Sequence, residues 1–432
     1  MRTQYSNQVD ETWNGRDVQL AGWVHEIRDM GKLKFLILRD RGGLIQVTAK
    51  KETTDAKVLE VIDSLSKESV ISVAGKVSAN PKAPNKVEII PHAITVTAMA
   101  NVPLPLDVTG KVDADLDTRL NNRFMDVRKP QVAAVFKIRS KVQASFREYF
   151  TGKGFVEINP PSIIAAASEG GTELFAISYF EREAFLCQSP QLYKQMMMAA
   201  GLDKVFITMP VFRAESHNTT RHLNEIYQMD IEKAFIRDEE GVLEELEGVF
   251  QHILKKVVED CPAELKLLGR DLAVPALPFR RLSYTEAVQL LDDSGVKIPW
   301  GSDFSPEAEK KLAELVKEPF FIKQWPTKLR AFYSKPDEDN AELCRAFDLD
   351  YMGMEIASGA QRIHNHDELV AALKRKNLKP ENFEFYLKAF RYGMPPHGGW
   401  SIGAERITEA ITGVSNIREV VLYPRDRTRL EP

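Results

Sequence analysis

The sequence contains few cysteines, and no two of them lie close together. Cys187, Cys261 and Cys344 are the only three in 432 residues, and no C-x-x-C pair occurs. This excludes a disulfide framework and a thiolate zinc site, and a reducing, cytoplasmic location is expected. No apolar run approaches the ~18 residues that a membrane-spanning helix needs, and the N-terminus lacks the apolar core of a signal peptide. We therefore expect a protein that is neither inserted into a membrane nor exported.

Two common nucleotide-binding motifs are also missing. Gly110-Lys111 is followed by Val112, and Gly152-Lys153 by Gly154, where a P-loop needs Ser or Thr; a strand-linked G-x-G-x-x-G is absent too. Positive charge is not in excess, because 58 Lys and Arg face 62 Asp and Glu for a formal charge of -4. The missing motifs exclude Walker-type and Rossmann-type nucleotide sites. The charge totals show no basic surface for nucleic acid.

The first hundred residues have the pattern of a small β-barrel. From about residue 18 to residue 97, short β-branched runs alternate with Gly-bearing turns, and one helical stretch covers residues 55–65. About five strands with a helix after the third favour an OB-type barrel over a sandwich. Pro103 and Pro105 then fix φ twice within three residues. We predict an OB-fold domain over 1–104, a hinge or linker over 105–130, and a second domain over 131–432.

The second domain mixes helices and strands without a regular βαβ order. Apolar residues at helical spacing predict long helices over 132–150 and 242–258, and strand-like pieces lie between and after them. This mixture predicts an α+β fold with a largely antiparallel sheet.

Three segments of this domain have an unusual local order. Residues 153–161 read as a helix end, a strand and the stop Pro160-Pro161; residues 212–232 read as a hairpin; residues 398–406 read as a glycine-punctuated strand entering a helix. The hairpin can present the Arg213 guanidinium to a phosphate, and Arg406 in a first helical turn can reach a polyphosphate. Each segment taken alone also has an ordinary structural interpretation. The first can be a helix end followed by a strand and a proline stop, the second an exposed hairpin with solvated charges, and the third a strand end with a surface arginine.

In chain order, these segments resemble motifs 1, 2 and 3 of the class II aminoacyl-tRNA synthetases. The resemblance implies a catalytic core with a six- to seven-stranded, mainly antiparallel sheet flanked by helices. Together with an N-terminal OB domain it resembles subclass b, whose members charge aspartate, asparagine or lysine. The space between motifs 2 and 3 is too short for a large extra domain, so the chain resembles the compact archaeal and eukaryotic type.

The segments 188–195 and 358–362 resemble the aspartyl-tRNA synthetase signatures. The resemblance implies that Lys194 and Arg362 clamp the substrate side-chain carboxylate, whereas Lys194 alone would be read as a helix-surface lysine. Residues 168–173 resemble the family's flipping loop, or are simply a Gly-rich turn. The aspartate-binding residues implied are Glu169, Ser189, Gln191, Lys194, Arg213, Asp230, Ser358 and Arg362.

The resemblance also implies the ATP site and the metal site. Arg213 would contact the α-phosphate, Glu215 the adenine amino group and Arg406 the γ-phosphate, while Arg221 and His222 would take the β- and γ-phosphates or the tRNA end. Ile226 and Tyr227 are both candidates for packing on adenine. Mg²⁺ would be held by Glu355 and Ser358, with Asp348 as a further or outer ligand, although a strand Glu is more often a solvated edge charge. The implied ATP-binding residues are Arg213, Glu215, Arg221, His222, Leu223, Glu355, Gly403 and Arg406.

For tRNA, the resemblance points to the barrel. It implies that Arg28, Phe35 and Gln46 read the anticodon; Phe35 could instead belong to the barrel core. His25 and Pro84 occupy two positions linked to tRNA discrimination and favour a tRNA(Asp)-specific enzyme, or else are a half-exposed strand histidine and a turn proline. Motif 1 implies a homodimer with Pro161 at the interface.

The function expected is an AMP-forming aspartate–tRNA ligase that uses ATP and Mg²⁺, L-aspartate and tRNA(Asp), with no membrane partner. A non-discriminating aspartyl enzyme acting on tRNA(Asp) and tRNA(Asn) is the first alternative. An asparaginyl synthetase or an asparagine-making paralogue is disfavoured by Lys194 and Arg362. A retired synthetase acting only as an RNA-binding module is disfavoured because Arg213, Glu215, Glu355 and Arg406 are retained.

Overall fold

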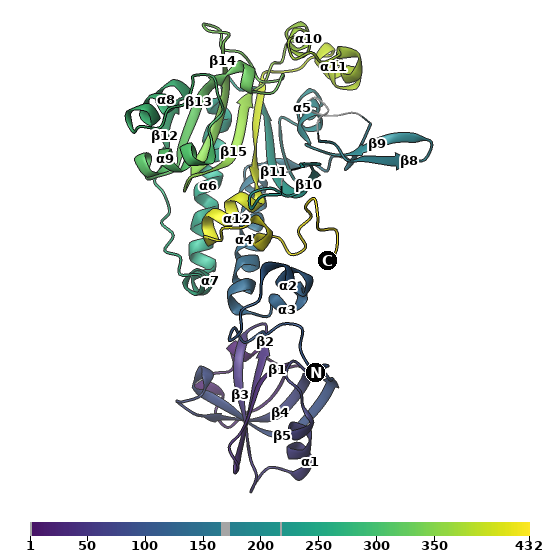
Figure 1. Cartoon of the computed structure of the whole chain (residues 1–432), viewed down its shortest axis with the longest axis vertical. Helices are drawn as coiled ribbons and strands as arrows, with labels where there is room; N and C mark the ends of the chain where they lie inside the picture. The colour runs from purple at the N-terminus through teal and green to yellow at the C-terminus, as the bar shows by residue number, and fades with distance from the viewer. Residues whose placement is uncertain (1, 166–172, 217) are drawn as a thin grey trace. The chain divides into compact units, whose positions relative to one another are not determined.

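The computed structural model describes residues 2–165, 173–216 and 218–432, and the chain divides into two compact units, 1–129 and 130–432 (Figure 1). Among the described residues, no helix combines the length and apolar character needed to cross a membrane. The three cysteines are buried and form no disulfide among the described residues.

The first unit is a closed five-stranded barrel in the order β1-β2-β3-β5-β4, with one helix, α1, between β3 and β4. The predicted helix over 55–65 is confirmed, since Asp55 caps α1 by accepting from the Lys57 amide. The strands and helix are β1 Asp17–Asp29, β2 Leu33–Asp40, β3 Gly43–Lys50, α1 Ala56–Ser64, β4 Val70–Ala79 and β5 Val87–Ala98. Strand β5 continues through Pro91, because its pairing with β4 shifts register there and so accommodates the proline.

The segment between the barrel and residue 130 has structure of its own. It contains α2 Leu116–Asn121 and α3 Arg123–Asp126, and Leu106, Val108 and Met125 form a small buried cluster. The fully buried Asp126 carboxylate binds the guanidinium groups of Arg119 and Arg123. These contacts order part of the predicted linker, and its role as a hinge stays a prediction.

The second unit is built on an eight-stranded sheet in the order β12-β13-β14-β15-β16-β11-β10-β6. Its strands are β6 Val156–Glu157, β10 Lys204–Phe212, β11 Glu225–Ala234, β12 Arg280–Ser283, β13 Phe320–Pro326, β14 Leu343–Tyr351, β15 Met354–Gln361 and β16 His397–Gly403. The α+β class with a mainly antiparallel sheet is confirmed, but the predicted six or seven strands were too few. The two edge strands, β6 and β12, are only two and four residues long and pair in parallel; β6 lies where a strand was predicted within 153–161, whereas the four residues of β12 are too few for a recognisable sequence pattern.

One face of the sheet is covered by α4 Pro130–Gly152, α6 Glu240–Asp260 and α12 Ala404–Thr412, whose apolar side chains share one core with the sheet. The helices predicted over 132–150 and 242–258 lie within α4 and α6 and are confirmed. A separate apolar cluster joins α5 Gln191–Ala199, α10 His366–Arg375 and α11 Glu384–Arg391. Further helices are α7 Pro262–Leu267, α8 Tyr284–Asp293 and α9 Pro306–Val316.

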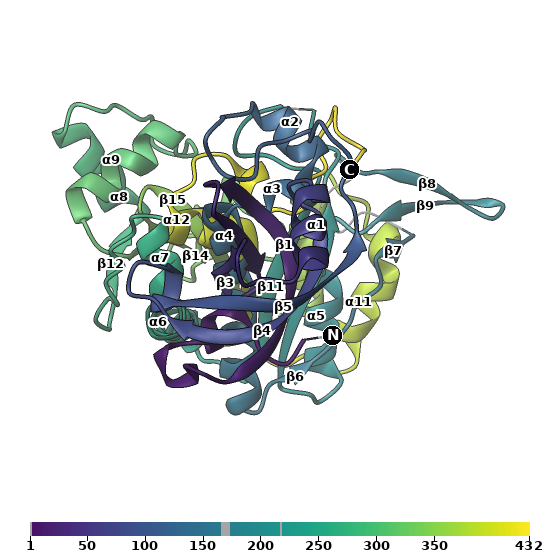
Figure 2. The same ribbon diagram turned by 90° about the horizontal axis from the view of Figure 1, so that it is seen from below.

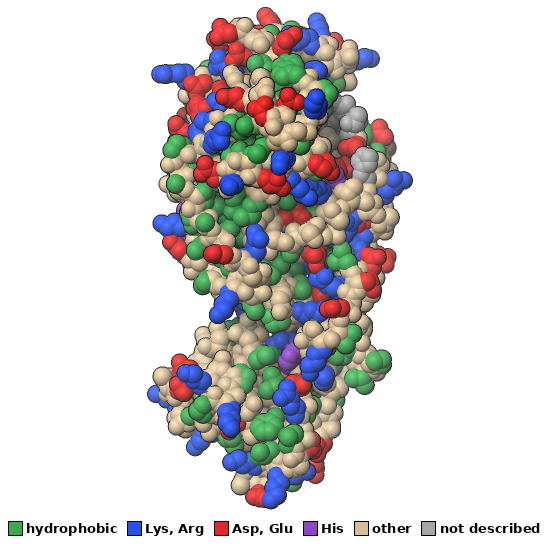
Figure 3. All heavy atoms as spheres, turned by 60° about the vertical axis from the view of Figure 1, so that its left-hand side comes forward, with side chains coloured by type: hydrophobic (Ala, Val, Ile, Leu, Met, Phe, Trp, Pro, Cys, Tyr) green, Lys and Arg blue, Asp and Glu red, His purple; other side chains and the backbone are tan. Residues whose placement is uncertain are grey.

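A small second sheet in the order β7-β9-β8 completes this unit, with β7 Ile163–Ile164, β8 Ala176–Tyr179 and β9 Arg182–Leu186. Its β8–β9 hairpin projects from the unit on the side opposite α8 and α9, as both ribbon views show (Figures 1 and 2). On the face drawn in Figure 3, positive and negative side chains are interspersed, in keeping with the small net charge.

Candidate active site

A polar cavity of about 300 Å³ lies on the face of the large sheet that α4 and α6 leave free. Strand alternation explains its position, because Met229 and Ile231 face the core while Gln228 and Asp230 line the cavity. Of the residues predicted for substrate binding, those that line this cavity are Ser189, Gln191, Arg213, Asp230, Glu355, Ser358, Arg362, Gly403 and Arg406. Residues more than 200 positions apart in sequence therefore meet in one site.

A polar row crosses four neighbouring strands, and three of its four members, Asp230, Ser401 and Ser358, line the cavity. Asp230 pairs in register with Ser401, Ser401 with Ser358, and Ser358 with Asp348. The Oγ atom of Ser401 and the Oδ1 atoms of Asp230 and Asp348 are buried without a hydrogen-bond partner among the described residues. Buried polar atoms are normally satisfied, so this row indicates a site built for a polar ligand.

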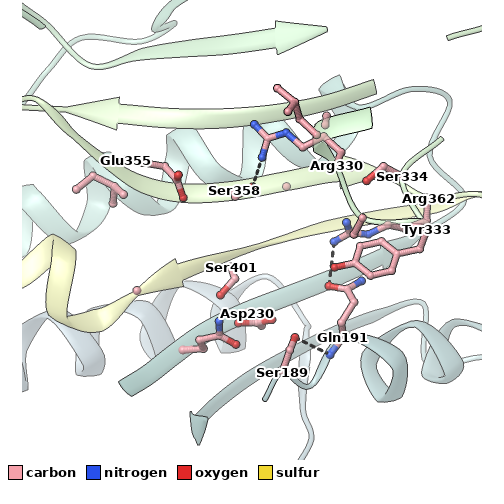
Figure 4. A pocket seen from close by; sticks show the side chains of 18 of the residues that line it. Ser189, Gln191, Asp230, Arg330, Tyr333, Ser334, Glu355, Ser358, Arg362 and Ser401 are labelled. Atoms are coloured by element: carbon pink, nitrogen blue, oxygen red, sulfur yellow. Dashed lines mark hydrogen bonds between the residues drawn. The ribbon is translucent and has the colours of Figure 1, made fainter. Parts of the chain in front are cut away.

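At one end of the row, two buried cations are paired with two buried carboxylates. The Lys194 ammonium donates to Asp230 Oδ2 at 2.8 Å and to the Trp400 carbonyl at 3.1 Å. The Arg362 guanidinium donates to Glu232 Oε1 at 3.0 Å and, as Figure 4 shows, to Gln191 Oε1 at 3.4 Å. Arg362 lines the cavity, whereas Lys194 does not line it and lies fully buried behind Asp230. Of the two residues predicted to clamp the substrate carboxylate, the structure thus places Arg362 at the cavity and Lys194 next to Asp230, outside the cavity lining.

Glu232 was missed by the sequence analysis, although it holds this end together. Its side chain is fully buried, lies 3.6 Å from the Lys194 ammonium and accepts two bonds from Arg362. The signal was present, because Asp230 and Glu232 alternate on one strand and so share a face. Burial also lowers the pKa of neighbouring His397 to about 4, which keeps this imidazole neutral at physiological pH.

At the other end, Glu355 and Arg406 line the cavity and form an ion pair at 3.3 Å. Asp348 lies beside Ser358 but does not line the cavity, and burial raises the pKa of its carboxyl to about 6. Burial also raises the pKa of Asp350 well above its usual value, next to the charges of Asp348, Glu309 and Glu355. Several carboxyl groups therefore lie close together at this end of the cavity, which favours the binding of cations there.

Four further residues that line the cavity were not identified from any motif in the sequence. Arg330, Tyr333 and Ser334 follow β13, and Gln228 comes from β11; all four line the cavity. The guanidinium of Arg330 donates to Ser358 Oγ at 3.1 Å and also to Asp348 (Figure 4). A single arginine after a buried strand carries no signal in the sequence, so these residues could be found only from the fold.

Several predicted residues lie away from the cavity. Glu215 lines a second cavity of about 580 Å³ beside the C-terminal residues 425–430. Leu223 is buried in an apolar cluster with Val135, Ile417 and Val420. Glu169 lies outside the described residues, and Pro161 is exposed between β6 and β7.

Arg221 and His222, the two residues of the motif 2 loop predicted to contact phosphates or the tRNA end, lie beside carboxylates, and their predicted roles stay predictions. Arg221 lies 3.5 Å from Glu309 Oε2, and His222 Nε2 lies 3.8 Å from Glu215 Oε2. Burial beside Glu355 raises the pKa of Glu309 to about 7.

Of the two candidates for packing on adenine, only Ile226 lines the cavity. Tyr227 does not line it, and its ring lies under the Arg139 guanidinium at 5.9 Å. Ile226 is therefore the residue of the pair that a base in this cavity would meet.

In the barrel, the predicted anticodon residues share neighbouring strands. Arg28 pairs in register with the half-buried Phe35, which pairs in turn with Thr48, and Ile37 pairs with Gln46. Phe35 does not belong to the buried barrel core. The Gln46 amide donates to Glu88 and to Thr48, at 3.0 Å and 3.1 Å. His25 Nδ1 lies 3.0 Å from Arg39 Nη1, whose guanidinium also binds Glu68, and Pro84 is exposed at the start of a short 3₁₀ helix.

Comparisons with known proteins agree with this geometry. Residues 115–427 match the family described as tRNA synthetases class II (D, K and N), and residues 18–97 match the OB-fold nucleic acid binding domain. The chain is 52% identical, over all of both chains, to an Aspartate--tRNA(Asp) ligase of Thermococcus kodakarensis. It belongs to the archaeal-type aspartyl branch of the class II tRNA synthetases.

Other relatives of this synthetase family differ in their tRNA range. The chain is 51% identical, again over all of both chains, to an Aspartate--tRNA(Asp/Asn) ligase of Methanopyrus kandleri. Among solved structures, the asparaginyl-tRNA synthetase of Pyrococcus horikoshii with asparaginyl-adenylate has a TM-score of 0.95 at 31% identity and full coverage of both chains. Members of this family use ATP. The fold is thus shared by aspartyl and asparaginyl synthetases, and specificity must lie in individual side chains.

Proposed function

We propose that this chain activates L-aspartate with ATP and transfers it to tRNA(Asp), discriminating against tRNA(Asn). The observation that supports the choice of amino acid is the buried pair of cations, Lys194 and Arg362, at one end of the cavity. A buried cation binds a carboxylate much better than a neutral amide, because the amide leaves its charge uncompensated. Asp230 would turn to the α-ammonium of the substrate, and the side-chain carboxylate would bind Arg362 and Lys194.

The first reaction needs no protein nucleophile. The aspartate α-carboxylate attacks the α-phosphorus of ATP in line, an O–P bond forms, and the bond to pyrophosphate breaks. Arg213 and Arg406 enter the cavity from β10–β11 and from α12 and would neutralise the charge that develops on the phosphates. The sheet holds both substrates in one cavity, so orientation supplies much of the rate. Adenine would pack on Ile226.

Glu355 and Ser358 fit a magnesium site. Both line the same cavity as Arg213 and Arg406, and Asp348 Oδ1 is a buried oxygen without a partner next to Ser358. Among the described residues, no three His, Cys, Asp or Glu side chains are grouped to hold a metal by themselves. This fits Mg²⁺, which is commonly bound by one or two protein oxygens together with substrate phosphates. Bound there, it would offset phosphate charge.

For the second reaction, the terminal ribose hydroxyl of tRNA attacks the aspartyl-adenylate and AMP leaves. The barrel would bind the anticodon through stacking on Phe35 and contacts from Arg28 and Gln46. The retired-synthetase alternative is disfavoured because Arg213, Glu355 and Arg406 converge on one cavity.

Discrimination between the two tRNAs rests on the barrel. Arg39 is fixed by two hydrogen bonds to Glu68, at 3.0 Å and 2.6 Å, and contacts His25, so the imidazole has a defined orientation. An oriented His25 together with Pro84 supports a tRNA(Asp)-specific enzyme. The first alternative, charging of both tRNAs, is favoured by relatives of that type at 51% identity.

Aspartylation of purified tRNA(Asp) and tRNA(Asn), measured side by side, tests the proposal. We expect charging of tRNA(Asp) and at least a hundredfold lower kcat/KM with tRNA(Asn). Comparable charging of both would establish the non-discriminating alternative. Charging of neither, with asparagine or lysine esterified instead, would refute the assignment.

We also propose a cytoplasmic homodimer with Pro161 at its interface. Pro161 is exposed and follows the edge strand β6 of the large sheet, which leaves this region available to a second copy. Light scattering of the purified chain should give twice the chain mass of 48.9 kDa. A monomer at micromolar concentration would contradict this part of the proposal.

A further inference from the structure

The guanidinium of Arg330 binds two of the side chains that the metal proposal uses, Ser358 and Asp348. Arg330 follows the short 3₁₀ helix Thr327–Leu329, and its side chain contacts one residue of β15 and one of β14. One terminal nitrogen donates to Ser358 Oγ at 3.1 Å, and the other donates to Asp348 Oδ2. A cation therefore already bridges Ser358 and Asp348 in the absence of any substrate.

The Arg330 guanidinium also packs against the Trp325 ring. Its guanidinium carbon lies 4.0 Å from the centre of the Trp325 ring, and Trp325 is buried. The Arg330 side chain is 17% exposed, and its Nε is buried without a hydrogen-bond partner among the described residues. A stacked arginine with two charge-assisted bonds has a defined position on the cavity wall.

The third proposed metal ligand is paired in the same way. Glu355 Oε1 lies 3.3 Å from Arg406, which also donates to the Glu355 carbonyl at 3.0 Å. Each of the three oxygen-bearing side chains proposed for the metal is thus bound by an arginine in the free chain. A divalent cation that used Ser358 and Asp348 would lie within a few ångströms of the Arg330 charge, where like charges repel strongly.

We propose that Arg330 is an internal counter-ion of the metal site, which holds Asp348 and Ser358 in the free protein and yields them to the divalent cation when ATP binds. The inference rests on the proposed ATP-dependent function, because ATP phosphates supply the remaining ligands. Arg330 acts through Asp348 and Ser358, so it is a positioning residue. It keeps a buried carboxylate paired and prevents the empty site from trapping divalent cations.

Mn²⁺ binding to the full chain without nucleotide, followed by electron paramagnetic resonance, tests this role. The neutral variant Arg330→Met should lower the Mn²⁺ dissociation constant about tenfold, since it removes a competing charge. Arg330→Gln is a second neutral variant with a polar side chain, so it reports on the charge even where Arg330→Met does not fold. The matched control Arg330→Lys retains the charge and should bind Mn²⁺ as weakly as the wild type.

The double variant Arg330→Met/Asp348→Asn identifies the oxygen that is released. If Arg330 competes for Asp348, the tighter Mn²⁺ binding of Arg330→Met should disappear in the double variant. A dissociation constant changed less than threefold in the neutral variants, or tighter binding that persists in the double variant, would overturn the proposal. This measurement requires neither aspartate nor tRNA, so its failure is distinct from failure of the proposed function.

Discussion

The two ends of the cavity are built differently. At the amino-acid end, Lys194 and Arg362 side chains are 1% and 4% exposed and are balanced by buried Asp230 and Glu232. At the phosphate end, Glu355 and Arg406 side chains are 35% and 42% exposed. The first end is buried and its charges are paired within the chain, whereas the second is more open to solvent, where we propose that ATP and Mg²⁺ bind. Under the proposed function, selection of the amino acid belongs to the buried end.

Replacing Lys194 should show the largest effect. We expect Lys194→Met to reduce kcat/KM for aspartate-dependent ATP–pyrophosphate exchange by at least about a thousandfold, because the change leaves Asp230 and Glu232 buried with one cation fewer. Exchange kinetics of folded protein provide the measurement. Lys388→Met, an exposed position on α11, is the control and should leave exchange unchanged. Exchange within tenfold of wild type in Lys194→Met would contradict the account.

Arg362→Lys tests whether the fork geometry matters as well as the charge. A lysine cannot bind Glu232 and the substrate carboxylate through a planar fork, so we expect about a hundredfold loss in kcat/KM for aspartate. The KM for ATP, measured in the same assay, should stay within twofold. An equal loss for both substrates would show that the two ends are not separate.

Arg406→Ala is the complementary change at the open end. We expect the KM for ATP to rise about thirtyfold while the KM for aspartate stays within twofold, because the half-exposed Arg406 serves the phosphates. Thermal unfolding should change little, since its ion pair with Glu355 is partly exposed. A large fall in melting temperature would instead indicate a structural role.

Glu409 offers a test of buried charge near Arg406. Burial raises its pKa from 4.5 to about 8, so the folded chain keeps a proton that the unfolded chain releases above pH 4.5. Stability should therefore fall as the pH rises from 4.5 to 8, with the full cost present above pH 8. Glu409→Gln should raise stability by about 1–3 kcal/mol at pH 8.5 and by almost nothing at pH 4.5. Thermal unfolding at both pH values tests this, and a pH-independent difference would contradict it.

Ile226→Phe should have the smallest effect. An aromatic ring gives a larger stacking surface for adenine than an aliphatic side chain, so we expect the KM for ATP to fall about threefold. Tyr227→Phe is the control, because Tyr227 does not line the cavity. If Tyr227→Phe changed the KM for ATP and Ile226→Phe did not, the position assigned to adenine would be wrong.

The barrel and the long helices could be predicted because their signals are local. The spacing of apolar residues identified α4 and α6, and Asp55 marked the start of α1. The polar row was not predictable, because it depends on register across four strands, including a shift between Leu349 and Asp350. Arg330 was not predicted for the same reason, because its partners Ser358 and Asp348 are distant in the sequence. Glu232 could have been predicted, because it shares a strand face with Asp230.

The most direct test of the buried cation pair is the preference for aspartate over asparagine in ATP–pyrophosphate exchange by the unmodified chain. We expect a ratio of kcat/KM of about 10⁴ or more, because asparagine would leave buried charge unpaired. A ratio near one, or a preference for asparagine, would contradict it.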